Sequence, residues 1–173
     1  MSQGGAGMPD HWARLWAPHR LEYLKGENRP LGDNEVACPF CRIPTLSNEE
    51  GLIVARGETA YVVMNLYPYN AGHLLICAFR HVPDLTDLTE IERNEISALS
   101  AHAMKTLRKV SNPAGFNLGM NQGAISGAGV ADHIHQHVVP RWAGDANFMP
   151  IIGQTKTLPQ LLSQTRDELA SAW

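Results

Sequence analysis

Three histidines stand at alternate positions in the last quarter of the sequence: His133, His135 and His137. On a β-strand alternate side chains point to the same face, so these imidazoles would repeat about every 6.6 Å along one side of a sheet. A neutral imidazole is a nucleophile, a proton carrier and a metal ligand, and its reference pKa of about 6.5 keeps it available at neutral pH. The spacing therefore predicts one strand that presents three reactive rings to a single site.

A second pattern is the pair Cys38 and Cys41, separated by Pro39 and Phe40. Two thiols at this spacing are typical of a tetrahedral zinc site or of a redox-active pair. We interpret residues 26–48 as a loop, because the segment is rich in Gly, Pro and Asn. In proteins of the thioredoxin type the redox-active cysteine pair stands at the start of a helix that follows a strand. A cysteine pair in a loop is therefore less consistent with redox chemistry. Two free thiols remain the plain alternative.

The elements that would position these residues follow from hydrophobic periodicity. A long helix is predicted from Thr86 to Val110, where apolar residues recur at three- and four-residue steps. Short apolar and β-branched runs between Gly- and Pro-containing turns predict strands. Antiparallel strands with one long helix indicate an α+β fold. The predicted strands are 52–56, 61–66, 73–79, 116–120 and 133–140.

The two ends of the chain are predicted separately. Residues 1–9 are small and Gly-rich, and we interpret them as a flexible tail. Asp10 is a good N-cap for a first helix, and Thr157 is predicted to cap a final helix that continues through Leu169. No repeat or composition break divides the remainder, so residues 10–173 are expected to form a single domain with a C-terminal helix.

Composition disfavours several classes of protein. The chain has 173 residues, of which 44% are hydrophobic and 18% charged, so it can bury a core. Its net charge is −3 and it has no run of basic residues, which disfavours a nucleic-acid partner. The longest apolar runs are far shorter than the ~20 residues that span a bilayer, so no membrane partner is expected. Three cysteines without a secretory signal pattern predict a cytoplasmic protein.

The His-x-His-x-His segment with its following valines resembles the motif of the histidine triad (HIT) family. The resemblance extends over residues 36–142, in several separate segments that occur in the family's order. It implies the HIT-like fold, an antiparallel five-stranded sheet with a long helix and flanking terminal helices. Within the family, the chain is most similar to the actinobacterial diadenosine tetraphosphate phosphorylases. The segments that carry the family resemblance are 65–73, 121–123, 133–139 and 140–142, and those that carry the similarity to the phosphorylases are 14–16, 65–70 and 140–148.

The resemblance implies a role for each histidine of the motif. His135 would attack an α-phosphorus and form a covalent nucleotidyl-histidine. His137 would contact phosphate or leaving-group oxygens, while His133 and His73 would orient the triad or serve another part of the site. The implied substrate contacts are Asn65 to ribose hydroxyls, Asn121 and Gln122 to phosphates, the loop residues Ser126, Gly127 and Gly129 to phosphate through backbone N–H groups, and Trp142 to adenine.

Plainer roles remain open for these substrate contacts. Asn65 and Asn121 are also typical of turns and local side-chain-to-backbone bonds. The Gly-rich loop 126–129 is compatible with an ordinary flexible turn. Trp142 could pack in the core, because a base and an apolar side chain use the same aromatic face.

Some branches of the family build a zinc site from a Cys pair, a His after the central strand and the first His of the triad. The corresponding positions in this chain are Cys38, Cys41, His81 and His133. Four such ligands close a tetrahedron, so the expected zinc is structural and has no open coordination position. No organic cofactor is expected, and the resemblance implies a homodimer that extends the sheet, or a larger homo-oligomer.

Three hypotheses for the function follow. The first is an enzyme that cleaves dinucleoside polyphosphates, diadenosine tetraphosphate above all, with phosphate as acceptor; its variant is a hydrolase of dinucleoside polyphosphates or phosphoramidates, with water as acceptor. The second is a non-catalytic nucleotide-binding module on the same fold. The third, a zinc-dependent redox or nucleic-acid module around Cys38 and Cys41, is remote, because there is one Cys pair and no basic patch.

Overall fold

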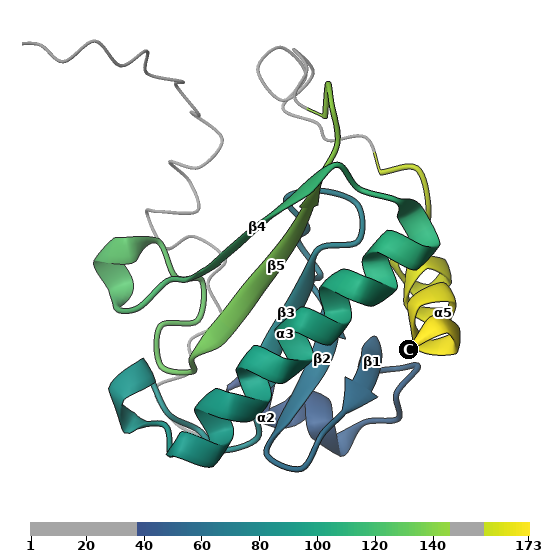
Figure 1. The fold of residues 1–173 in the computed structure, drawn as a ribbon. Helices are drawn as coiled ribbons and strands as arrows, with labels where there is room; N and C mark the ends of the chain where they lie inside the picture. The colour runs from purple at the N-terminus through teal and green to yellow at the C-terminus, as the bar shows by residue number, and fades with distance from the viewer. Residues whose placement is uncertain (1–37, 146–157) are drawn as a thin grey trace, which may run out of the picture.

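The computed structural model describes residues 38–145 and 158–173. A five-stranded sheet lies at its centre, with strand order β1-β2-β3-β5-β4 and antiparallel pairing throughout (Figure 1). The α+β fold class is therefore confirmed, while the predicted tail 1–9 and first helix lie outside the described residues. The strands are β1 (Ile53–Arg56), β2 (Ala60–Met64), β3 (Leu74–Ala78), β4 (Gly115–Met120) and β5 (His135–Arg141).

The long helix α3 spans Glu90–Ser111 and begins four residues later than the sequence predicted. Thr89 and Glu92 form a capping box, in which each side chain bonds to the other residue's backbone N–H. The predicted start at Thr86 is wrong because Leu85–Asp87 forms the separate 3-10 turn η2. At the other end the left-handed residue Asn112 terminates the helix.

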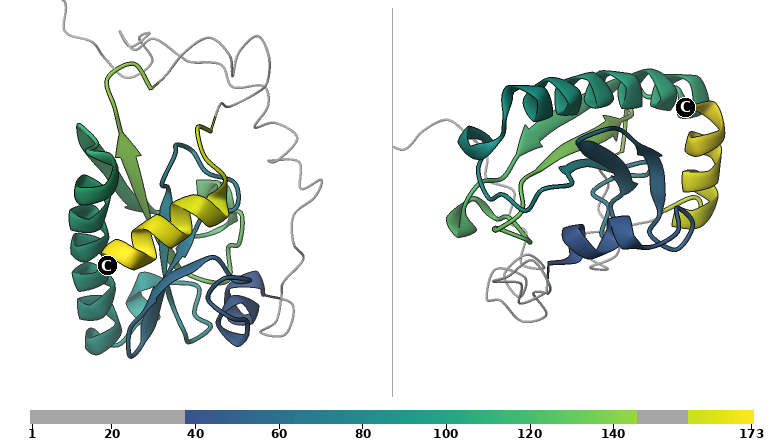
Figure 2. Two further views of the ribbon diagram at one scale, coloured as in Figure 1. Left: turned by 90° about the vertical axis from the view of Figure 1, so that its right-hand side faces the viewer. Right: turned by 90° about the horizontal axis from the view of Figure 1, so that it is seen from below.

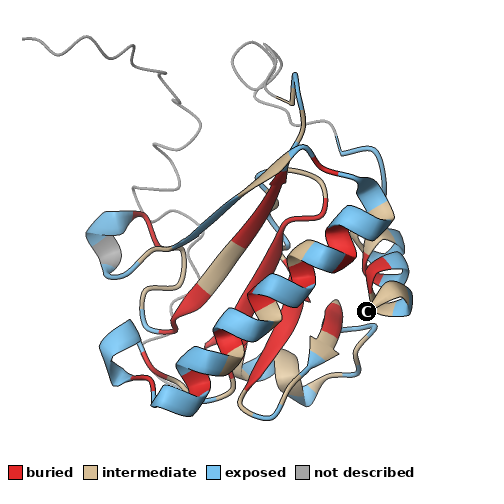
Figure 3. Cartoon of the chain, in the orientation of Figure 1, coloured by how far each residue is buried: buried red, intermediate tan, exposed pale blue. Residues whose placement is uncertain are grey.

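The two faces of the sheet are covered differently. Helix α3 packs across β2, β3 and β5 on one face, and buries a core that includes Val62, Ile76 and Val138 (Figures 2 and 3). The short helix α2 (Pro39–Arg42) lies on the opposite face. Because strand side chains alternate, Tyr61 and the neighbouring odd positions point to the α2 side and form a second, smaller apolar cluster.

The interpretation of residues 26–48 as a loop is wrong for its described part. Pro39 occupies the first turn of α2, where its fixed φ favours a helix and its missing N–H costs nothing. The 3-10 turn η1 (Ile43–Thr45) follows directly. Cys38 is the N-cap of α2, so the pair does begin a helix, and the argument against redox chemistry from a loop position no longer holds.

The last helix, α5 (Leu162–Ala172), packs against β1 and α3. Its N-cap is Leu161, so the prediction that Thr157 caps this helix is wrong; residue 157 itself lies outside the described residues. The buried Arg166 fixes α5 to the sheet by donating from Nε to the carbonyl of Ile53, at 2.7 Å. No described helix is both long enough and apolar enough to cross a membrane.

Candidate active site

The triad histidines lie on the face of the sheet opposite α3. In β5, His135 pairs with Cys77 and His137 pairs with Leu75 of the central strand β3. His133 precedes the strand by two residues; its ring and that of His135 both contact Phe40, and the rings of His135 and His137 are 5.0 Å apart, so the predicted common face is confirmed. Two of these histidines are buried: His133 exposes 0% of its surface and His135 exposes 5%.

His135 is held in one tautomer by the backbone. Its Nδ1 lies 2.8 Å from the carbonyl oxygen of His133, and because a carbonyl only accepts, Nδ1 carries the proton. The other nitrogen, Nε2, therefore keeps its lone pair. Burial lowers the pKa of His135, which favours this neutral form. The ring of Phe40 packs on the imidazole with 4.8 Å between centroids and restricts its rotation.

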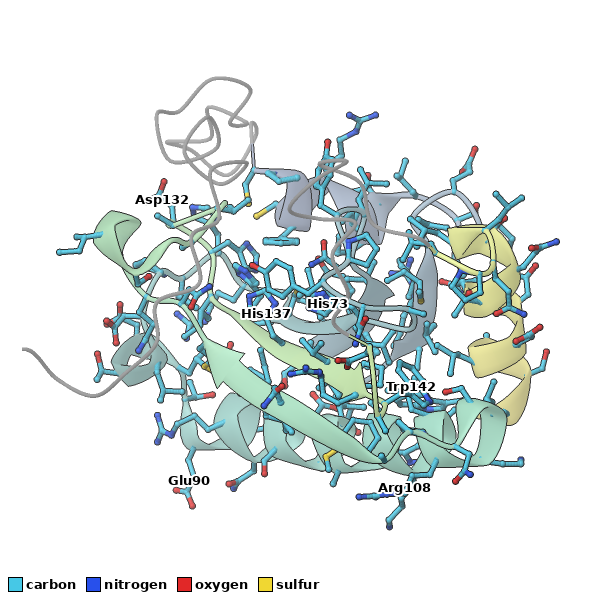
Figure 4. The ribbon with its side chains drawn as sticks, turned by 90° about the horizontal axis from the view of Figure 1, so that it is seen from above. His73, Glu90, Arg108, Asp132, His137 and Trp142 are labelled. Atoms are coloured by element: carbon cyan, nitrogen blue, oxygen red, sulfur yellow. The ribbon has the colours of Figure 1, made fainter. Side chains whose placement is uncertain are left out.

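His137 belongs to a hydrogen-bonded relay with His73, the buried residue just before β3. The backbone N–H of Tyr69 donates to Nδ1 of His73 at 3.0 Å, so the proton of this neutral ring sits on Nε2. That Nε2 lies 2.9 Å from Nδ1 of His137, and the two rings lie side by side in Figure 4. The relay therefore places the proton of His137 on its Nε2.

The Nε2 atom of His137 is buried and has no hydrogen-bond partner in the part of the chain that the structure describes. A buried polar atom without a partner is costly, and such atoms occur where a ligand completes the bond. Burial lowers the pKa of His137 to about 4, with a smaller effect of nearby His135. The site thus presents a neutral N–H donor beside the lone pair of His135; the two rings are 5.0 Å apart.

Four side chains meet at the N-terminal end of this strand. The ligand atoms of Cys38, Cys41, His81 and His133 lie within 4.8 Å of one another, and this group could hold a metal ion. The sulfurs of Cys38 and Cys41 are each 3.4 Å from Nδ1 of His133, and Nδ1 of His81 is 3.3 Å from the Cys41 sulfur. The structure therefore brings together all four residues of the set that the sequence suggested.

His133 is prepared as a ligand by its second nitrogen. Nε2 of His133 donates to the carbonyl oxygen of Ala78 at 2.9 Å, which leaves the lone pair on Nδ1, the atom that faces the two sulfurs. Burial lowers the pKa of His133 to about 4 and keeps the ring neutral, as metal binding requires.

The predicted substrate contacts lie at different distances from the histidines. Asn65 is close: its Nδ2 is 3.2 Å from Nδ1 of His73, and its Oδ1 accepts from the N–H of Tyr67. Asn121 is half-buried at the end of β4. Gln122 instead accepts from the backbone N–H of Leu85 at 2.6 Å, which ties this loop to η2.

The remaining contacts were predicted in the Gly-rich loop and beyond β5. Ser126 lies in the 3-10 turn η3 (Ala124–Ser126), and its hydroxyl donates to the carbonyl of Gly123. Gly127 is buried with φ +85°, a conformation that favours glycine, and Gly129 is half-buried. Trp142 lies apart from the histidines, past the far end of β5, where its Nε1 donates to the carbonyl of Ser111 (Figure 4).

Two residues near the histidines were missed as site residues. Phe40 contacts the rings of both His133 and His135, and only its place between the cysteines could have signalled this. Tyr69 contacts His73 and His137, and its position inside the turn before His73 was the available signal. Side-chain direction in a helix of four residues or in a turn depends on tertiary packing, which periodicity does not report.

This combination of fold and histidine spacing agrees with comparisons to known proteins. The profile of the HIT domain family matches residues 47–144, more than half of the chain. The chain belongs to the HIT domain family. The resemblance seen in the sequence is thereby confirmed.

Relatives within the HIT family include enzymes of dinucleoside polyphosphates. The AP-4-A phosphorylase of Mycobacterium tuberculosis (strain H37Rv) is 49% identical over 172 residues, which cover 98% of this chain and 88% of the relative. The asymmetrical bis(5'-nucleosyl)-tetraphosphatase of Schizosaccharomyces pombe is 31% identical over 90 residues, 52% of this chain and 49% of the relative. A zinc-bound HIT family protein of Mycobacterium smegmatis shares the fold, with TM-score 0.64 and 23% identity over 80% of this chain and 94% of that chain.

Proposed function

We propose that this HIT protein cleaves diadenosine tetraphosphate through a nucleotidyl-histidine intermediate and transfers the nucleotidyl group to inorganic phosphate. The observation that carries the proposal is the tautomer of His135: the carbonyl of His133 holds Nδ1–H and leaves the Nε2 lone pair for attack. The 49% identity with a relative named AP-4-A phosphorylase supports this substrate and this acceptor.

In the first step Nε2 of His135 attacks the α-phosphorus. The N–P bond forms as the P–O bond to the rest of the substrate breaks, and ATP leaves with the bonding electron pair. The imidazole becomes positively charged, and its Nδ1–H bond to the His133 carbonyl becomes a stronger, charge-assisted bond. The unpartnered Nε2–H of His137 is placed to donate to the oxygen on which negative charge develops.

In the second step an oxygen of inorganic phosphate attacks the same phosphorus. The N–P bond breaks, its electron pair returns to Nε2 of His135, and the product is ADP. With water as the nucleophile the product would be AMP, and the protein would be a hydrolase. The histidine chemistry is the same in both reactions, so only the products distinguish them.

The proposed substrate contacts keep the assignments made from the sequence. Asn65 would hold ribose hydroxyls, and its closeness to His73 supports this. Asn121 and the backbone of Gly127 and Gly129 would face phosphates, supported by the positive φ of Gly127, which opens the chain to close approach. The proposed contacts of Gln122, Ser126 and Trp142 rest on the resemblance alone, because Gln122 Oε1, the Ser126 hydroxyl and Trp142 Nε1 bond within the chain.

We propose that the Cys38–Cys41–His81–His133 cluster holds a structural zinc ion. The donor set of two thiols and two imidazoles suits zinc. Its S···N separations of 3.3–3.4 Å are close to the edge of about 3.5 Å that tetrahedral bonds to sulfur and nitrogen would give. A bound zinc would supply no chemistry to the substrate but would fix the start of β5, and with it the carbonyl that orients His135.

We also propose that β4 is the contact between two copies of the chain. It forms one edge of the sheet, and Leu118 on it is 47% exposed. The other edge strand, β1, is covered by α5. No strand of the described residues pairs with the outer edge of β4, and an open edge strand is a template for pairing, so two copies joined at β4 would form one continuous sheet.

The product assay tests the acceptor. Diadenosine tetraphosphate is incubated with the protein, with and without inorganic phosphate, and nucleotides are separated by anion exchange. ADP and ATP that form only when phosphate is present support the proposal. AMP and ATP regardless of phosphate would show a hydrolase instead.

The variant His135→Ala tests the nucleophile. Radiolabelled substrate should label wild-type protein during a single turnover, and the variant should form no adduct while it still binds nucleotide. His102→Ala, which changes an exposed histidine of α3, is the control for general effects of histidine removal. A variant at position 135 that keeps most of the rate contradicts the assignment, and nucleotide binding without any adduct in the wild type would favour a binding module.

A further inference from the structure

The turn between β2 and β3 brings Tyr69 against the two histidines of the relay. The Tyr69 ring lies nearly parallel to that of His137, with 5.7 Å between centroids and 22° between planes. It is also 4.8 Å from the ring of His73, at 36°. Figure 4 shows His73 and His137 close together, and Tyr69 therefore packs over the place where these two histidines meet.

Tyr69 contacts the relay through its backbone as well as its ring. Its N–H donates to Nδ1 of His73 at 3.0 Å, and this bond makes Nε2 of His73 the donor to His137. The Asn65 amide Nδ2 approaches the same Nδ1 at 3.2 Å, so Tyr69 and Asn65 together favour this proton order. Tyr69 alone adds a ring that packs over both histidines.

We propose that Tyr69 is a positioning residue for the His73–His137 relay: its backbone N–H, together with the Asn65 amide, sets the proton order, and its ring shields the hydrogen bond between the histidines from water. The proposal rests on the proposed function, in which His137 donates to the leaving group. It adds a residue that acts through the relay, without contact to the reacting atoms.

The turn is built to hold Tyr69 in this place. The neighbouring Asn70 donates from Nδ2 to the carbonyl of Pro140 at 3.1 Å and to Asp145 at 2.7 Å. Asp145 is itself held by two bonds from Arg141, at 2.6 and 2.9 Å. These bonds connect the turn to the end of β5, the strand that carries His137, and to the segment that follows it. The turn that carries Tyr69 and the strand that carries His137 are therefore held together by these hydrogen bonds.

The ring matters because water competes for hydrogen bonds. A hydrogen bond is electrostatically stronger where water is excluded, so an uncovered His73–His137 bond would be weaker and would persist for less time. The titratable side chains packed on His137 in the described region are His73 and Tyr69 from the turn and its end, and His135 from its own strand. None of these described groups is a carboxylate or an amine.

Three variants separate the ring from other effects. Tyr69→Leu removes the aromatic cover, Tyr69→Phe keeps the ring without the hydroxyl, and Tyr67→Leu changes a tyrosine of the same turn that is 79% exposed. We expect Tyr69→Leu to slow the first, nucleotidyl-transfer step by up to about tenfold, the size of an aromatic stack, with KM nearly unchanged. Tyr69→Phe should restore the rate, and Tyr67→Leu should match the wild type.

A second measurement does not depend on substrate. NMR titration of the ¹⁵N-labelled histidines, with His137 assigned through the variant His137→Gln, should show a higher pKa for His137 in Tyr69→Leu than in Tyr69→Phe. If the wild type does not turn over the substrate, the proposed function fails, but this titration still tests the ring. A raised KM with unchanged rate, a loss in Tyr69→Phe equal to that in Tyr69→Leu, or an unchanged His137 titration would each overturn the role of Tyr69.

Discussion

Replacing His137 by Gln should make the protein less sensitive to mild acid. The folded protein holds the pKa of His137 at about 4, because burial disfavours the charged ring. In the unfolded chain the pKa returns to about 6.5. Between these values the unfolded state binds one more proton than the folded state, so stability falls as the pH is lowered from about 6.5 to about 4.

The size of this effect follows from the two pKa values. Below pH 4 the whole pKa difference is felt, and the free energy of unfolding is about 3 kcal/mol lower than at neutral pH. At pH 5 it is about 2 kcal/mol lower than at pH 7. Glutamine does not titrate, and its side-chain oxygen can accept the hydrogen bond from His73. The variant should therefore lose about 2 kcal/mol less than the wild type between pH 7 and pH 5.

Urea unfolding at pH 7 and pH 5 measures this difference. Wild type and His137→Gln are compared at equal ionic strength and equal metal content, because the cysteine–histidine cluster also responds to pH. For each protein the free energy of unfolding at pH 5 is subtracted from that at pH 7. Any loss of stability that the substitution causes equally at both pH values cancels in this difference. An equal loss of stability in the two proteins would refute the conclusion that the fold keeps His137 neutral.

Three further variants test other parts of the structure. Cys41→Ser should lose bound zinc in native mass spectrometry, while Cys77→Ala, which changes a buried cysteine outside the cluster, should keep it. Gly72→Ala should lower stability in urea unfolding by about 1–2 kcal/mol, because φ is +69° there and the new methyl group would touch a leucine of α3. Glu92→Gln should be less stable than the wild type at pH 7 in the same assay, because the hydrogen bond from Arg80 lowers the pKa of Glu92 to about 2. The difference in unfolding free energy between the two proteins should disappear as the pH falls from about 4.5 through about 2.

The sequence predicted the parts of the site that depend on strand periodicity. The three histidines share a face because alternation on a strand is a local rule, and the structure keeps it through His133, His135 and His137. The strand limits were also predicted to within a few residues, because Gly- and Pro-containing turns separate the apolar runs. The grouping of Cys38 and Cys41 with distant histidines came from family resemblance, since spacing alone shows only the first two ligands.

The predictions that were wrong or missing concern positions where the local sequence allows more than one structure. Thr86 and Thr89 both stand before the long helix, and the reciprocal bonds between Thr89 and Glu92 decide the start. Helix α2 contains only Pro39–Arg42, too short for any periodicity to appear. Tyr69 lies in a turn, where no repeat states which way a side chain points. These positions are determined by contacts that form only once the sheet is assembled.

The position of His133 relates the proposed metal site to the proposed reaction on the same strand. Its side chain points Nδ1 toward the two cysteines, while its backbone carbonyl orients His135, the proposed nucleophile. Phe40, between those cysteines, packs on both rings. A shift of the cluster would therefore move both the carbonyl acceptor and the aromatic wall of His135. In the proposed mechanism a closed, four-ligand metal site would therefore act on the reaction only by fixing the direction of the His135 lone pair.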